Sequence, residues 1–227
     1  TPAQDQPIAN PACEGAHATL RAADANRRSN ASDARAMHEQ ALGQYRQCDD
    51  WLGEARALVG LGSTDSTLGN SSAARSEYRS AQQIYHQHGV SLGEAGALLG
   101  LGEVERMADN HAEARTNFRA ALELYKAAGN RSGQANALGG LGNVERVVGN
   151  NSAAREAYQS SLALAREDGN GVAEANALRG LGDLESVLGN TDAAREALRS
   201  AEQAAARSNY PLGQATALRS LGDLEQV

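Results

Sequence analysis

The feature that most constrains the fold is an internal repeat of 40 residues. When the sequence is compared with itself at this offset, four segments align: ALVGLGSTDSTLGN at 57–70, ALLGLGEVERMADN at 97–110, ALGGLGNVERVVGN at 137–150 and ALRGLGDLESVLGN at 177–190. A repeat of this length is typical of elongated proteins in which each copy packs against its neighbours. The chain is therefore predicted to be a row of similar structural repeats.

Six registers of the repeat cover most of the chain. The clear copies are 52–91, 92–131, 132–171 and 172–211, and residues 212–227 stop partway through another copy. A diverged first copy at about 12–51 aligns with them through Asn30, Ala34, Arg35, Ala41 and Tyr45. Residues 1–13, TPAQDQPIANPAC, hold three of the four prolines and no helical period, so we expect a flexible segment there and a repeat domain at 14–227.

Each repeat is predicted to contain two helices, because apolar residues recur at intervals of three and four in each half. Gly149 and Asn150 lie between the halves of the copy 132–171. Glycine favours the end of one helix, and asparagine can cap the start of the next. The pattern predicts five helix pairs and a final single helix. The two apolar stripes in this copy are Leu138, Leu141 and Val144, then Ala154, Tyr158, Leu162 and Ala165.

The repeated positions resemble those of the tetratricopeptide repeat family. Leu141-Gly142, Ala154, Tyr158 and Ser161 follow that family's pattern of Leu-Gly, Ala, aromatic and Ala, and the pattern returns in register along residues 14–227. The period of 40 is longer than the usual 34. This longer repeat is similar to a subclass found in Pins-type adaptors and many bacterial regulatory proteins.

The resemblance implies an all-α, tetratricopeptide-type α-solenoid: a right-handed superhelix of antiparallel helix pairs whose first helices line a concave groove. It also implies a scaffold or adaptor that binds an extended or helical peptide in the groove and is not an enzyme. A second function stays open, because the sequence stops in mid-repeat. The chain would then be a ligand-sensing or regulatory segment of a larger signalling, protease-linked or transcriptional protein.

Positions on the first helices that vary between repeats are the candidates for the binding groove. Asparagine can bond a peptide backbone in both directions, and arginine can grip a carboxylate with two parallel hydrogen bonds. We therefore expect a protein or peptide partner with acidic groups; a solvated helix face is the alternative for any single residue. The candidates are Arg56, Val59, Ser63, Ser66, Leu99, Glu103, Arg106, Asn136, Asn143, Arg146, Asn176, Arg179, Asp183 and Ser186.

Glycines that recur in every clear repeat are predicted to serve close packing. They form a Gly-x-Gly pair, and we expect the second of each pair at a helix contact and the first, at 60, 100, 140 and 180, on a smooth groove floor. A glycine inside a helix costs about 0.5–1 kcal/mol relative to alanine, so the set needs a compensating gain. A dinucleotide fingerprint requires a third glycine where Glu145 stands, so no nucleotide site or cofactor is predicted.

An acid and an arginine also recur from repeat to repeat. Each acid lies ten positions before an arginine, across the predicted turn, so we expect the two to pair within one repeat. The acids are Asp65, Glu105, Glu145 and Glu185, and the arginines are Arg75, Arg115, Arg155 and Arg195.

Several other functions are not predicted. The net charge of −7 and the pI near 5.3 argue against a nucleic-acid partner. No run approaches 18 apolar residues, so no transmembrane segment is expected. His86 and His88 are two positions apart and so face different sides of a helix, which argues against a metal site. The oligomeric state is left open.

Cys13 and Cys48 lie at the start of the first predicted helix and the end of the second. An antiparallel hairpin brings these ends together, so a disulfide is favoured over two reduced thiols. Oxidation would indicate a periplasmic or secreted protein, and free thiols a cytoplasmic one. Thr1 in place of a methionine also suggests a processed or excised chain.

Overall fold

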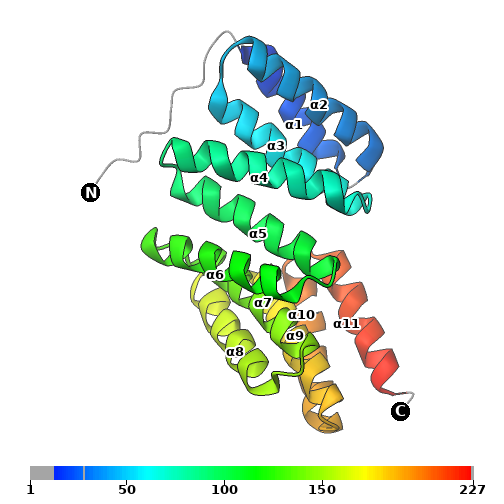
Figure 1. The fold of residues 1–227 in the computed structure, drawn as a ribbon. Helices are drawn as coiled ribbons and strands as arrows, with labels where there is room; N and C mark the ends of the chain where they lie inside the picture. The colour runs from blue at the N-terminus through cyan, green and yellow to red at the C-terminus, as the bar shows by residue number, and fades with distance from the viewer. Residues whose placement is uncertain (1–12, 28, 226–227) are drawn as a thin grey trace. The chain divides into compact units, whose positions relative to one another are not determined.

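The computed structural model describes residues 13–27 and 29–225, and every regular element within them is a helix (Figure 1). The predicted all-α class is therefore confirmed. Except for Cys13, the segment 1–13 lies outside the described residues. The helices are α1 (Glu14–Asn26), α2 (Ala31–Gln47), α3 (Trp51–Thr67), α4 (Ser71–Gln87), α5 (Ser91–Met107), α6 (His111–Ala127), α7 (Arg131–Val147), α8 (Asn151–Glu167), α9 (Gly171–Val187), α10 (Thr191–Arg207) and α11 (Pro211–Leu224).

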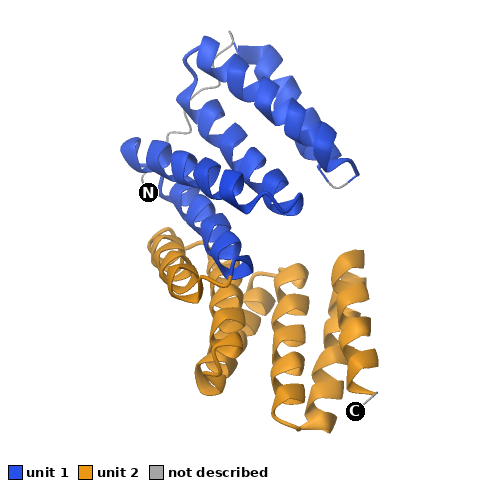
Figure 2. Ribbon diagram, turned by 45° about the vertical axis from the view of Figure 1, so that its right-hand side comes forward, with its two compact units in different colours: residues 1–108 blue, residues 109–227 orange. Residues whose placement is uncertain are grey.

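The chain divides into two compact units, residues 1–108 and residues 109–227 (Figure 2). Within each unit, helices that follow one another in the chain pack side by side. The odd-numbered helices are the first helices of the repeats and the even-numbered ones the second. Alanines on both kinds of helix are fully buried, as at Ala55 and Ala74 in unit 1 and Ala137 and Ala154 in unit 2. These small side chains let neighbouring helices approach closely.

The turns between helices need a residue with a positive φ, which ends one helix before the next begins. Gly149 supplies it between α7 and α8, with φ of 80°. Asn150 follows, but its side chain does not cap α8 as expected. Instead its Nδ2 donates to Glu145 Oε2 over 2.8 Å, so this asparagine ties the turn to an acid on the preceding helix.

A large side chain on a second helix lies between two glycines of the flanking first helices. A Cβ added to Gly142 would lie 2.6 Å from the Tyr158 ring, and one added to Gly180 would also overlap it. Tyr78 has the same relationship to Gly62 and Gly100 in unit 1. The second glycine of the pair is thus at a helix contact at positions 62, 142 and 182.

The first glycine of each pair does not form the open groove floor that the sequence suggested. Gly140 meets the Phe118 ring and Gly180 the Tyr158 ring, both from the preceding second helix. A ring already fills the space in which a ligand backbone was expected. Both glycines therefore serve packing, one within a helix pair and the other between pairs.

Candidate functional site

Ion pairs connect four of the second helices, α2, α4, α6 and α8, to the first helix that follows, whereas Arg195 on α10 pairs with Asp192 of its own helix. Arg115 Nε on α6 lies 2.6 Å from Glu145 Oε1 on α7, thirty positions later in the chain. The predicted pairing within one repeat, ten positions apart, is therefore wrong. Glu145 lies near the end of α7 and is buried against α6. Arg115 lies near the start of α6. The other pairs are Arg35 with Asp65, Arg75 with Glu105 and Arg155 with Glu185.

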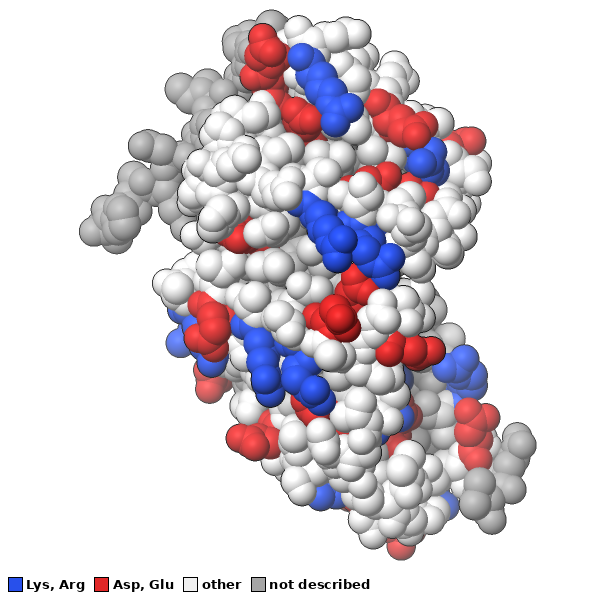
Figure 3. All heavy atoms as spheres, in the orientation of Figure 1, with Lys and Arg blue, Asp and Glu red and all other residues white. Residues whose placement is uncertain are grey.

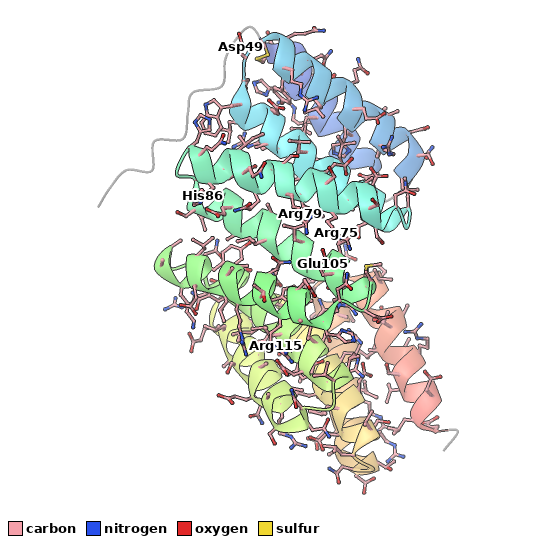
Figure 4. The ribbon with its side chains drawn as sticks, viewed as in Figure 1. Asp49, Arg75, Arg79, His86, Glu105 and Arg115 are labelled. Carbon is pink, nitrogen blue, oxygen red and sulfur yellow. A yellow bond between two sulfur atoms is a disulfide. The ribbon has the colours of Figure 1, made fainter. Side chains whose placement is uncertain are left out.

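These ion pairs stabilise the packing of neighbouring helices, because the acids are largely buried and hydrogen-bonded. Arg75 and Glu105 point toward each other from α4 and α5 (Figure 4). Hydrogen bonds from Arg115 and then Asn150 hold the pKa of Glu145 below its usual value, although burial opposes them. Since both partners are engaged, this recurring ladder is not the binding site.

In unit 2, four predicted groove residues gather around the hydroxyl of Tyr158. The Tyr158 ring lies between α7 and α9, and its hydroxyl donates to Asn143 Oδ1 over 2.8 Å. Burial raises the pKa of this phenol, and Arg146 and then Arg179 oppose the rise. The hydroxyl is thus close enough to Arg146 and Arg179 for both charges to act on it, and it lies at the surface formed by α7 and α9.

Arg146 hydrogen-bonds toward Tyr158 but has one unsatisfied nitrogen. Its Nε is buried and has no hydrogen-bond partner among the described residues. A buried N–H of a guanidinium normally has an acceptor, because its desolvation is otherwise uncompensated. Arg146 as a whole is half-buried. A carboxylate or carbonyl oxygen of a ligand is a suitable acceptor.

Arg179 and Asp183 form an ion pair of 2.8 Å along α9. Both side chains are partly exposed, at 26% and 19%. Partly exposed pairs contribute little to stability, so Arg179 can exchange Asp183 for another carboxylate at low cost. Asn136 on α7 and Asn176 on α9 are exposed, each seven positions, or about two turns, before a member of the cluster. We call the surface formed by Asn136, Asn143, Arg146, Asn176, Arg179, Asp183 and the Tyr158 hydroxyl the α7–α9 face.

Unit 1 has a related arrangement with different chemistry. Tyr78 occupies the position of Tyr158, and Ser63 occupies that of Asn143. Arg27 Nη1 donates to Ser63 Oγ over 2.8 Å, while Arg106 pairs with Glu103 at 2.5 Å on α5. The other candidates here, Arg56, Leu99, Val59 and Ser66, lie on α3 and α5; Arg56 is exposed and the other three are half-buried.

Sequence reasoning missed the two tyrosines and Arg27 as parts of these faces. The position of Tyr158 is otherwise filled by Phe118, Leu198 and His38, so it was interpreted as core alone. The signal that could have revealed this role was the phenolic hydroxyl. Among the residues at this repeat position, only Tyr78 and Tyr158 have one.

One carboxyl in unit 1 is held in an unusual state. Burial raises the pKa of Glu77 on α4 to about 7, and the neighbouring Asp65 adds to the rise. Asp65 is fully buried and accepts hydrogen bonds from Arg35 and Asn70. Because Arg35 is occupied by Asp65, Glu77 lacks a full counter-charge and holds a proton more tightly than usual.

Cys13 and Cys48 are joined by a disulfide, with their Cα atoms 5.9 Å apart. Cys13 precedes α1 and Cys48 follows α2, so the bond closes the open end of the first helical hairpin. The nearby histidines are engaged in contacts of their own. His88 stacks on Trp51 with ring centroids 3.7 Å apart, and His86 lies 3.1 Å from Glu94.

Residues 13–27 and 29–225 contain no group of three His, Cys, Asp or Glu side chains arranged to hold a metal ion. None of the helices α1–α11 is long and apolar enough to cross a membrane. On the face drawn in Figure 3, basic and acidic side chains are interspersed and neither sign dominates.

Comparisons with known proteins agree with this architecture. A family model described as "Tetratricopeptide repeat" matches residues 93–167 and 133–207, which together span just over half of the chain. No curated protein matches the sequence.

Solved structures of the same fold have low sequence identity. The crystal structure of BtubC from P. vanneervenii is 16% identical with a TM-score of 0.69, covering 87% of this chain and 88% of that one. The Rap conjugation gene regulator of plasmid pLS20, in complex with the Phr* peptide, is 16% identical with a TM-score of 0.76, covering 96% and 62%. Aspartyl phosphate phosphatase F from Bacillus subtilis is 11% identical with a TM-score of 0.69, covering 96% and 61%. The chain therefore spans less than two thirds of the last two proteins.

Proposed function

Because the chain belongs to the tetratricopeptide repeat family, we propose that it is a non-catalytic adaptor that binds an acidic peptide segment on the α7–α9 face. The observation that carries the proposal is Arg146, whose Nε is buried without an acceptor beside the Tyr158 hydroxyl. An arginine in this condition gains more from a carboxylate than a solvated surface arginine does.

The rest of the face fits an extended segment. Arg179 supplies a second cation, held in place by Asp183 until a ligand carboxylate replaces that partner. Asn136 and Asn176 can each accept from a peptide N–H and donate to a peptide carbonyl. The occupant is thus an acidic segment that spans α7 and α9. The Rap conjugation gene regulator, which shares the fold, was solved with a peptide bound.

The second candidate is a regulatory segment of a larger protein. It is favoured by the comparison with that same regulator, because this chain covers only 62% of it. Both candidates use the α7–α9 face for recognition and differ in what the binding event controls.

The test is direct binding of synthetic peptides. Fluorescently labelled, extended ten-residue peptides with several Asp or Glu residues are titrated against the full chain, and amide-matched Asn and Gln versions serve as ligand controls. The acidic peptides should bind, and R146E/R179E should abolish that binding without changing helicity. R199E/R207E makes the same charge change at exposed positions on α10 and should bind normally. Undiminished binding to R146E/R179E, or equal binding of the amide peptides, contradicts the proposal.

We also propose an oxidising compartment, periplasmic or extracellular, because disulfides such as Cys13–Cys48 persist there. The cytoplasmic alternative requires reduced thiols. Thiol titration of protein purified from its native host, under denaturing and non-reducing conditions, separates the two. No reactive thiol supports export, and two reactive thiols support the cytoplasm.

A further inference from the structure

Unit 2 contains an open cavity where the turn between α8 and α9 meets the end of α10. Its volume is about 550 Å³, which lies within the usual range of small-molecule sites. None of its lining residues belongs to the α7–α9 face. We call it the α8–α10 cavity, and its lining consists of Arg166, Gly169, Asn170, Gly171, Val172, Glu174, Arg207 and Ser208.

Two arginines of the cavity share a single carboxylate. Arg166 Nε lies 3.0 Å from Glu174 Oε1, whereas Arg207 Nη2 lies 3.8 Å from Glu174 Oε2, which is too far for a hydrogen bond. The two arginine side chains are 57% and 63% exposed, and that of Glu174 is 18% exposed. The lining therefore has one positive charge in excess, and Arg207 can donate to an anion that enters the cavity.

The corresponding place in unit 1 has the same framework. Arg46 pairs with Glu54 over 2.8 Å, as Arg166 does with Glu174 three repeats later. In both units the ion pair connects the end of a second helix to the start of the next first helix. The two places can therefore be compared position by position.

Unit 1 fills this place with an aromatic ring of its own. The rings of Trp51 and His88 are stacked, with centroids 3.7 Å apart and an angle of 2° between their planes. In unit 2 these two positions are Gly171 and Ser208, and both line the cavity. Small residues thus leave open in unit 2 a space that a flat ring occupies in unit 1. An arginine, Arg207, also takes the place of the neutral residue 87.

We infer that the α8–α10 cavity binds a small planar aromatic carboxylate. The ring takes the place of the Trp51 indole and packs against Val172, an apolar side chain that is 40% exposed. The carboxylate accepts hydrogen bonds from Arg207, whose planar guanidinium can pair with it through two parallel bonds. The excess of one positive charge matches a carboxylate monoanion better than a phosphate dianion.

This site is independent of the proposed peptide-binding face. R146E/R179E should lose the acidic peptide and still bind the aromatic acid. R199E/R207E should show the reverse, because Arg207 lines the cavity and lies outside the α7–α9 face. Failure of either proposal is therefore recognised separately.

The probe is indole-3-carboxylate, titrated against the full chain by isothermal titration calorimetry. Indole-3-carboxamide keeps the ring and lacks the charge, while cyclohexanecarboxylate keeps the charge and lacks the flat ring. We expect saturable one-to-one binding of the probe and much weaker binding of both control ligands. Absence of saturable binding, or equal binding of the carboxamide, overturns the inference.

Two variants locate the binding. R207Q, which copies Gln87 of unit 1, should weaken binding about tenfold, because one charge-assisted hydrogen bond is lost. R199Q is the matched control, since Arg199 is an exposed arginine of α10 outside the cavity, and it should bind normally.

G171W/S208H places the Trp51–His88 stack in the cavity and should abolish binding by filling it. Both residues are changed together, because a Cβ on Gly171 would overlap Ser208 Oγ. Circular dichroism checks that the variants keep their helicity. Undiminished binding to R207Q or to a folded G171W/S208H overturns the inference.

Discussion

The hydroxyl of Tyr158 donates a hydrogen bond to Asn143 Oδ1 over 2.8 Å, while the ring below it packs between Gly142 and Gly180. One side chain therefore belongs to both the core and the candidate binding face. Its ring holds α7 and α9 together, and its hydroxyl orients an amide beside Arg146. If the proposed function holds, stability and recognition are coupled at this residue.

Tyr158→Phe separates these two roles. The ring and its contacts remain, as at Phe118, so the free energy of unfolding should fall by only about 0.5–1.5 kcal/mol, the usual net contribution of one hydrogen bond. Acidic-peptide binding should weaken, because Asn143 loses its orientation. Urea unfolding and peptide titration measure the two effects. Tyr158→Ala, which removes the ring, should cost about 3–5 kcal/mol.

Gly180→Ala tests the packing of the first glycine. Helix propensity alone predicts stabilisation by about 0.5–1 kcal/mol, whereas the overlap with the Tyr158 ring predicts destabilisation by about 1–3 kcal/mol. We expect destabilisation in urea unfolding. G43A, with open space at the added methyl, should be neutral or stabilising, and stabilisation of G180A by the same amount would falsify the packing assignment.

A double-mutant cycle tests the register of the ion-pair ladder. R115Q and E145Q should be coupled by about 0.5–3 kcal/mol, because the guanidinium and carboxylate bond directly. R155Q and E145Q, the pair expected within one repeat, should be additive. The reverse pattern in urea unfolding would restore the register that the sequence suggested.

Glu77 should make stability fall as pH rises. Its pKa in the folded protein, about 7, lies above the ordinary value of 4.5, so its proton favours the folded state at low pH. This contribution is complete below about pH 4.5 and is lost as the pH rises through 7. E77A, which copies Ala157 of a later repeat, should raise the stability measured at pH 8 relative to pH 5 by about 1–3 kcal/mol compared with wild type. An identical pH profile for E77A and wild type contradicts the assignment.

Much of the fold was predictable because its determinants are local. The apolar spacing in 132–171 predicted two helices, and Gly149 predicted the turn between them, since both depend on residues near in sequence. The partner of Glu145 was not local. Because the arginine recurs every 40 residues, Glu145 has one ten positions later, Arg155, and one thirty positions earlier, Arg115. Only the direction in which the Glu145 side chain points decides between them.

The candidate site was predictable in part for the same reason. Asn143, Arg146, Arg179 and Asp183 were found because they vary on first helices, and the structure brings them together around Tyr158. The role of Tyr158 was missed because its position in the repeat is a core position. The pattern of apolar residues does not show that the hydroxyl of the same side chain reaches the candidate face. The space beside Gly140 is filled by the Phe118 ring of the preceding repeat, and no local sequence pattern specifies that contact.

The most direct test of the account is the NMR signal of the Arg146 Nε–H group during titration with an acidic peptide. If the α7–α9 face binds the peptide, the Arg146 and Arg179 signals should shift and saturate together, while the Arg155 signal, from a guanidinium already bonded to Glu185, should stay in place. Binding that reaches saturation with the Arg146 signal unchanged would contradict the account.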